Sequence, residues 1–184
     1  MYLLGHLGIS LLLFSPLAAL LFSGGQVVLA VLTGALMIAL GPFPDFDEYT
    51  DRVPHRGPTH TVWFALGTGV FVALVVFAFS VGIEGGTVGG NAVAAAGDPV
   101  GVTALTVADP LGSALWFGAV ATLAICGHLA GDILTPMGIW PFQPVSDVHY
   151  SFDITPAKNP RANWTLLAAG SVSVALAVAV GHVA

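Results

Sequence analysis

PDFDEYTDRVPHRGPTH, residues 44–60, is the most polar stretch of a chain that is otherwise strongly apolar. It carries four of the ten acidic residues, two of the six histidines and two of the four basic residues. Long apolar segments flank it on both sides. A solvated loop at a membrane surface would explain its charge. Its use of Asp and His, the side chains that bind divalent metals and transfer protons, favours a chemical role.

The composition is that of an integral membrane protein. Of the 184 residues, 56% are hydrophobic and 8% are charged, whereas soluble domains carry about 25% charged residues. We therefore expect a single integral membrane domain over residues 1–184. The single cysteine, Cys126, excludes an internal disulfide and a multi-cysteine zinc site. The net charge is −6 and the sequence has no basic patch, so we expect no nucleic-acid partner.

Five segments have the length and apolar character of membrane-spanning helices, each of which needs about 20 residues. They cover approximately residues 3–22, 26–40, 61–83, 111–134 and 164–182. The sequence thus predicts an all-α, polytopic helix bundle with about five transmembrane helices, located in the cell membrane.

Five spans place the N-terminus and the connections 45–60 and 135–163 on one membrane face. All four basic residues fall on that face: Arg52, Arg56, Lys158 and Arg161. The positive-inside rule predicts that it is cytoplasmic. The far-side connection, residues 84–113, has no Lys or Arg, and 103–107 within it could be extended.

The same topology brings candidate metal ligands from distant segments to one depth. They are His6, Asp45, Asp47, His60, His128 and Asp132. His128 and Asp132 are spaced i, i+4 and share a helix face, so both can reach one ion. A hydrogen bond within a buried polar pair would explain the spacing equally well. Ionisable groups inside a span are costly, however, and they usually mark functional sites.

The residues around the two aspartates leave several interpretations open. Pro44 favours an extended Phe43, and alternate side chains of an extended segment face the same way, so Asp45 and Asp47 could point at one site. Thr59 could be the N-cap of the third span, and His60 a polar residue at its mouth.

Other polar residues are weaker candidates. His55 and Arg56 could be ligands, acids or anion-binding groups, or interfacial charges. We expect His149 and Asp147 to form an exposed loop pair, and His182 to be a polar residue at the opposite end of the bundle.

Four motifs occur in an order that resembles a known family: His6, then PDFD at 44–47, HRGPTH at 55–60, and His128-x-x-x-Asp132-x-x-Thr135-Pro136-x-Gly138. They are similar to the membrane-bound metal-dependent hydrolases, also described as LexA-binding, inner-membrane-associated hydrolases. The resemblance covers roughly residues 3–154. It implies a polytopic hydrolase with a metal site formed by its His and Asp residues. The LexA-binding label is not carried over to this chain.

These observations predict a metal-dependent hydrolase acting at the cytoplasmic membrane face. The ligand set would hold one or two divalent ions, with zinc the first expectation. Asp47 would serve as general base, and His55 and Arg56 would balance the charge of an anionic substrate. We expect an amphiphilic small-molecule substrate, such as a phospholipid-like ester or phosphoester, drawn from the membrane lipid.

The alternative is a small metal or proton transporter that uses the same His/Asp cluster. A transporter predicts polar residues that continue through the bundle. The third and fifth spans offer almost none, which favours a site at one face.

Overall fold

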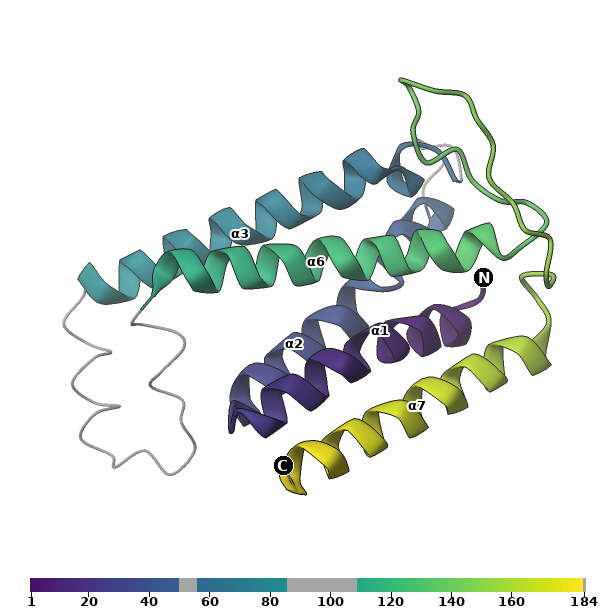
Figure 1. The fold of residues 1–184 in the computed structure, drawn as a ribbon. Helices are drawn as coiled ribbons and strands as arrows, with labels where there is room; N and C mark the ends of the chain where they lie inside the picture. The colour runs from purple at the N-terminus through teal and green to yellow at the C-terminus, as the bar shows by residue number, and fades with distance from the viewer. Residues whose placement is uncertain (50–55, 86–108, 184) are drawn as a thin grey trace.

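The computed structural model describes residues 1–49, 56–85 and 109–183 and is built from long helices (Figure 1). In chain order the elements are α1 (Leu3–Ser23), α2 (Val27–Leu40), the 3-10 helices η1 (Phe43–Tyr49) and η2 (Pro58–His60), α3 (Val62–Gly85), α6 (Pro110–Ile133) and α7 (Pro160–Val183). The described residues contain no strand, only an isolated bridge between Ile139 and Tyr150. The all-α prediction is confirmed. The largest difference in bounds is at α7, which begins at Pro160 and not at Trp164.

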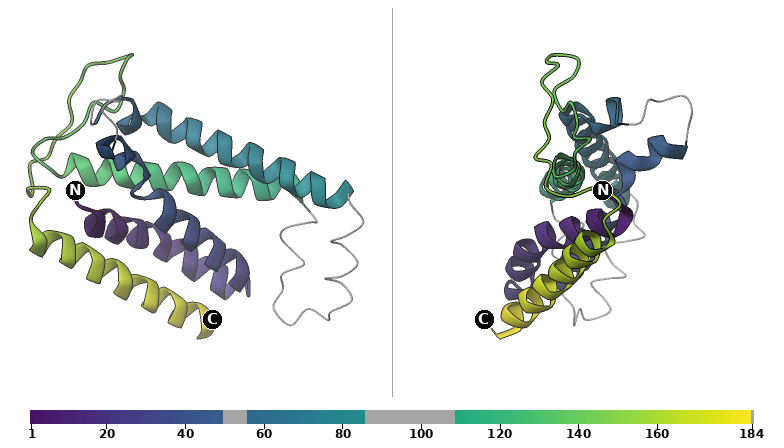
Figure 2. Two further views of the ribbon diagram at one scale, coloured as in Figure 1. Left: turned by 180° about the vertical axis from the view of Figure 1, so that it is seen from behind. Right: turned by 90° about the vertical axis from the view of Figure 1, so that its right-hand side faces the viewer.

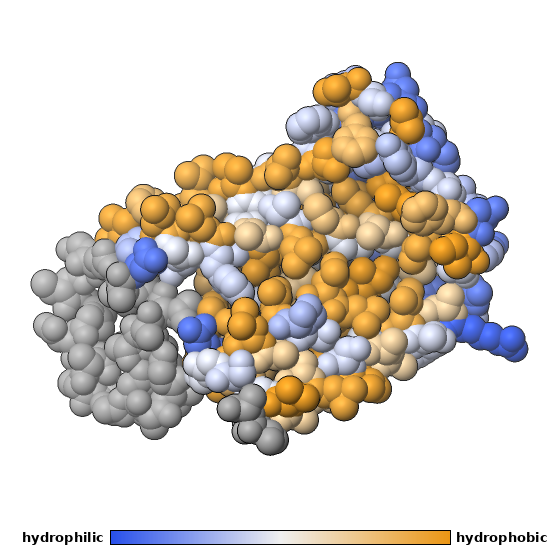
Figure 3. Space-filling model, in the orientation of Figure 1, coloured by the Kyte–Doolittle hydropathy of each residue, from blue (hydrophilic) through white to orange (hydrophobic). Residues whose placement is uncertain are grey.

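In the described part of the chain, five helices are long and apolar enough to cross a membrane. The side of the molecule in Figure 3 is largely apolar, and hydrophilic residues gather at the end that carries the N-terminus. Helix α3 exposes large side chains, including Leu66, Phe71, Leu74 and Phe79. Such a surface is stable in lipid and would be an aggregation hazard in water. The prediction of a multi-pass membrane protein is confirmed.

Polar side chains at three positions define where helices begin. Asp109 accepts a hydrogen bond from the Gly112 amide at the start of α6, and Asn159 accepts one from the Arg161 amide at the start of α7. At α3 the capping residue is Thr61, whose Oγ1 accepts from the Phe64 amide at 3.2 Å. The expectation that Thr59 caps this helix is therefore wrong, because α3 begins two residues too late for Thr59 to reach its free amides.

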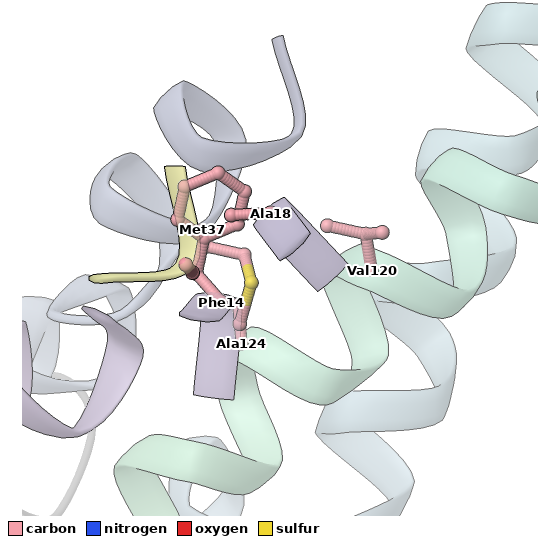
Figure 4. Close-up of a cluster of buried hydrophobic side chains, with 6 residues drawn as sticks. Phe14, Ala18, Met37, Val120 and Ala124 are labelled. Atoms are coloured by element: carbon pink, nitrogen blue, oxygen red, sulfur yellow. The ribbon is translucent and has the colours of Figure 1, made fainter. Parts of the chain in front are cut away.

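The helices pack in two close pairs, α1 with α7 and α3 with α6, and α1 also contacts α2 and α6. The backbones of α1 and α7 touch, since a methyl group at Gly8 would clash with Leu166 and one at Gly170 would clash with Gly8. Small residues allow such close approach in membrane bundles. The main core cluster contains Phe14, Ala18, Met37, Val120, Ala124 and Ala177 (Figure 4).

The N-terminus, η1, η2 and the connection between α6 and α7 all lie at one end of the bundle (Figures 1 and 2). This is the convergence that the five-span topology predicts. His55 and the segment 103–107 lie outside the described residues.

Candidate metal centre

Three imidazoles and two carboxylates meet at this end of the bundle. His6 comes from α1, Asp45 from η1, His60 from η2, and His128 and Asp132 from the last turns of α6. All but Asp45 are fully buried. Ligand atoms of His6, Asp45, His128 and Asp132 lie within 4.8 Å of one another. Residues far apart in the sequence thus surround one point.

The nitrogen–oxygen distances show how compact the cluster is. His128 Nε2 lies 3.3 Å from Asp45 Oδ1 and 3.4 Å from Asp132 Oδ2. His60 Nε2 lies 3.5 Å and 3.2 Å from the same two oxygens. His6 Nε2 is 3.6 Å from one oxygen of each aspartate. Zinc sites in proteins use thiolate sulfur, imidazole nitrogen and carboxylate oxygen as ligands, and this cluster offers the last two.

Hydrogen bonds at the opposite ring nitrogens assign the tautomers of two histidines. His128 Nδ1 lies 2.8 Å from the Gly41 carbonyl oxygen, which can only accept, so Nδ1 carries the hydrogen. The Thr59 hydroxyl donates to Asp47 Oδ2 at 2.7 Å. Its oxygen is therefore the acceptor for His60 Nδ1, 3.0 Å away. In both neutral rings, Nε2 presents a lone pair to the cluster.

Those two Nε2 atoms are 3.1 Å apart. Two lone pairs at that distance repel each other unless a cation or a proton lies between them. Asp132 Oδ2 is buried and has no hydrogen-bond partner among the described residues, although both Nε2 atoms are near it. The donor set and the orphaned oxygen fit a bound cation.

The local electrostatics favour positive charge at the same point. Burial lowers the pKa of His60, but the adjacent carboxylates of Asp132, Asp45 and Asp47 outweigh burial and raise the pKa to about 9. The carboxylates thus stabilise a cation at His60 Nε2, whether it is a proton or a metal ion.

Asp47 contacts Nδ1 of His60, the ring nitrogen that faces away from the cluster, and does not lie beside Asp45. The extended conformation expected at Phe43 is wrong, because Phe43–Tyr49 forms a 3-10 helix. With three residues per turn, side chains two positions apart point in different directions. Asp47 Oδ2 lies 3.3 Å from His60 Nδ1 and accepts from the Arg56 amide at 3.0 Å. Such a carboxylate orients a ligating imidazole, whereas the role of Asp47 as ligand or base stays a prediction.

Arg56 holds the other oxygen of Asp132. Its Nη2 donates to Asp132 Oδ1 at 2.9 Å, and its Nη1 donates to the Gly138 carbonyl at 2.9 Å and to Thr135 Oγ1 at 3.1 Å. The amino group of Met1 also pairs with Asp132 Oδ1. Arg56 has φ 60°, a left-handed conformation that costs a non-glycine residue about 1–2 kcal/mol. Strained backbone of this kind clusters at functional sites.

His6 reaches the cluster through a close approach of α1 and α6. Its ring stacks on that of His128, with centroids 3.8 Å apart and an interplanar angle of 11°. A Cβ atom at Gly131 would lie 3.1 Å from His6 Nδ1 and 2.8 Å from Ile9 Cδ1. His6 Nε2 donates to the Met1 carbonyl at 3.0 Å, so an ion bound at Nε2 would replace that hydrogen bond.

The loop histidine lies outside the cluster. His149 is exposed, with its Nε2 2.9 Å from the Met137 carbonyl, and Asp147 accepts from Gln143 Nε2. Both residues are surface groups, as the sequence predicted.

Three groups near the site were given no site role in the sequence analysis. The Gly41 carbonyl and Thr135 accept hydrogen bonds from His128 and Arg56, and Lys158 lines a cavity beside the cluster. Thr135 lies in the motif that follows Asp132, which was an available signal. A backbone carbonyl has no sequence signal, because every residue has one.

A cavity of about 310 Å³ lies beside the cluster. Asp45 and Arg56 line it from the cluster side, and Thr135, Met137 and Lys158 line it from the connection between α6 and α7. The side chain of Asp45 is 20% exposed, whereas that of Asp132 is fully buried. Asp45 therefore contacts both the cluster and the cavity.

Membrane-crossing helices with a buried His/Asp cluster at one end define this chain as a multi-pass membrane protein with a candidate metal centre. The chain belongs to the YdjM inner membrane protein family, whose model matches residues 1–183. No curated protein and no solved structure matches it. The family match confirms the predicted membrane location and does not specify a reaction.

Proposed function

We propose that this protein is a metal-dependent hydrolase whose active site lies at one membrane face. The observation that carries the proposal is the cluster of three imidazoles and two carboxylates. Ligand atoms of His6, Asp45, His128 and Asp132 lie within 4.8 Å of one another, and His60 Nε2 lies 3.2 Å from Asp132 Oδ2. Burying this many ionisable groups costs several kcal/mol unless they are paired or bind an ion. A function that uses them explains why the chain places them there.

The proposed ligands divide into a preoriented group and an adaptable one. His60 and His128 are fixed by hydrogen bonds at Nδ1, and Asp132 is fixed by Arg56 at Oδ1. Asp45 and His6 would complete the set, and His6 would give up its hydrogen bond to the Met1 carbonyl to bind the ion. Ligand atoms of His6, Asp45, His128 and Asp132 lie within 4.8 Å of one another and suit a single divalent ion, with His60 beside them, and zinc is our first candidate.

A divalent ion at this position supplies Lewis-acid activation of water and of the ester carbonyl or phosphoryl oxygen. The protein contributes orientation and proton transfer. Asp45 faces both the cluster and the cavity, so one of its oxygens can take a proton from an attacking water. Asp47 is buried behind His60 and acts by orienting that ring. Arg56 holds Asp132 in place.

The position of the cluster favours an amphiphilic substrate. The elements that carry the cluster, namely the start of α1, η1, η2 and the end of α6, lie at one end of the bundle (Figure 1), the end at which hydrophilic residues gather in Figure 3. The polar head of a lipid-like ester could enter the cavity while its apolar part stays in the bilayer. The hydrophobic part would then need no desolvation during the reaction.

The transporter alternative uses the same residues and differs in what lies beyond them. Among the described residues, the buried side chains that can ionise are His6, Asp47, Arg56, His60, His128 and Asp132, all at the cluster end. The buried polar residues farther along the helices are Ser10, Thr33, Ser80 and Ser113. In the described part of the chain, no relay of ionisable groups continues across the bundle, which favours the hydrolase.

The test compares hydrolysis with ion flux. Detergent-purified protein is assayed against a panel of lipid esters and phosphoesters, and the same protein is reconstituted in liposomes for metal and proton flux. We expect turnover that a chelator abolishes and zinc or manganese restores, and a large loss of rate in Asp45→Asn with the fold retained. Metal-dependent flux without hydrolysis of any substrate in the panel would overturn the proposal.

A further inference from the structure

We propose that the cavity beside the cluster binds a phosphate oxyanion, so that the substrate is an anionic phosphoester and Arg56 and Lys158 select for it. The inference rests on the proposed hydrolase function, because it takes the His/Asp cluster as the reacting centre. It adds the class of substrate and a specificity residue, Lys158, which comes from the last connection of the chain.

The cavity has a volume of about 310 Å³ and is open to the surface. A phosphorylated head group of a few heavy atoms fits this space while attached acyl chains stay outside it. The cavity therefore suits the polar end of an amphiphile.

Arg56 leaves one donor unused. Its Nη1 and Nη2 groups are occupied by Gly138, Thr135 and Asp132. Its Nε is buried without a hydrogen-bond partner among the described residues, and Arg56 lines the cavity. The guanidinium charge of Arg56 would attract an oxyanion bound in this cavity.

Lys158 brings a second positive charge to the same cavity. Its side chain is exposed, and in the part of the chain that the structure describes it forms no ion pair. Glu48 also lines the cavity and would repel an anion. Asp45, the other acid that lines the cavity, lies beside the imidazoles of His60 and His128. Lys158 and Glu48 should thus act on a bound anion in opposite directions.

A phosphate group can use these contacts together. Its terminal oxygens can accept from the Lys158 ammonium and lie near the Arg56 guanidinium charge while the phosphorus atom faces the cluster. In the hydrolysis, the water oxygen forms a bond to phosphorus, the ester P–O bond breaks, and the alcohol leaves with a proton. A neutral carboxylic ester offers no such charge to Arg56 and Lys158.

Binding of glycerol phosphate to chelator-treated, detergent-purified protein tests the inference without depending on turnover. Isothermal titration calorimetry should show that Lys158→Gln weakens binding about fivefold or more, that Lys158→Arg restores it, and that Glu48→Gln strengthens it. The control is Arg161→Gln, which removes an exposed positive charge three residues away and should change the dissociation constant less than twofold. Equal effects of Lys158→Gln and Arg161→Gln would overturn the inference.

A second arm identifies the source of the phosphate. Short-chain phosphatidic acid in nanodiscs should bind more tightly than glycerol phosphate if the substrate is a lipid, and no more tightly if it is a soluble ester. If the wild type binds neither probe but still holds metal and hydrolyses neutral esters, the proposed phosphate site is wrong and the proposed hydrolase function stands. Phosphate binding without metal or hydrolysis would instead count against the hydrolase.

Discussion

The Nε2 atoms of His60 and His128 lie 3.1 Å apart, and in each neutral ring this is the nitrogen without a hydrogen. His128 donates from Nδ1 to the Gly41 carbonyl, and His60 donates from Nδ1 to Thr59. Two carboxylates lie close to the same pair of nitrogens, since Asp45 and Asp132 each place an oxygen within 3.5 Å of both. This arrangement of two lone pairs and two carboxylates favours a cation that all four side chains contact.

Asp47 should support metal binding indirectly. Asp47→Asn weakens the interaction at His60 Nδ1 and leaves every cluster donor in place, so we expect metal affinity to fall about 10- to 100-fold. Competition with a chromophoric zinc chelator measures the change. Asp45→Asn removes a proposed ligand and should cost more. If Asp47→Asn costs as much as Asp45→Asn, Asp47 is itself a ligand and its contacts with His60 do not describe its role.

Gly131 should be needed for the position of His6. In Gly131→Ala the added methyl group meets Ile9 and His6, so we expect about 1–3 kcal/mol of destabilisation together with weaker metal binding. Thermal unfolding in detergent and metal content are the measurements. Gly82→Ala in α3 is the matched control, because a Cβ atom there meets nothing within 4 Å. Wild-type behaviour of Gly131→Ala would show that α1 and α6 can separate without loss of the site.

The membrane orientation is predicted by the four basic residues, which the five-span topology assigns to the face of the cluster. A reporter that is active only in the cytoplasm should be active when fused after Arg161 and inactive when fused after Gly90. Activity in both fusions would contradict the five-span topology. Activity only after Gly90 would keep the topology and reverse the orientation.

The local features of the fold follow from the sequence, because they depend on hydrophobic length and helix periodicity. The five spans and the i, i+4 pair of His128 and Asp132 are of this kind. The positions of Asp45 and Asp47 were not predictable in the same way. Pro44 is compatible with the first turn of a helix as well as with extended backbone, and the chain adopts the 3-10 helix.

Tertiary contacts account for the other features that the sequence left unspecified. The acceptor for His128 is a backbone carbonyl at the end of α2, and the space for His6 is set by Gly131 on α6. Lys158 reaches the cavity because the connection between α6 and α7 folds back over the cluster end. Each of these depends on how helices approach one another, which single-sequence periodicity does not encode.

Metal content measured by inductively coupled plasma mass spectrometry is the most direct test of the central claim. Detergent-purified wild-type protein should carry about one divalent ion per chain, and His128→Ala and Asp132→Ala should each lose most of it. His149→Ala is the control, because that exposed imidazole contacts the Met137 carbonyl and not the cluster. Two results would contradict a metal centre at this site. One is the same metal content in the wild type and all three variants. The other is a wild type that binds no divalent ion after incubation with zinc and manganese.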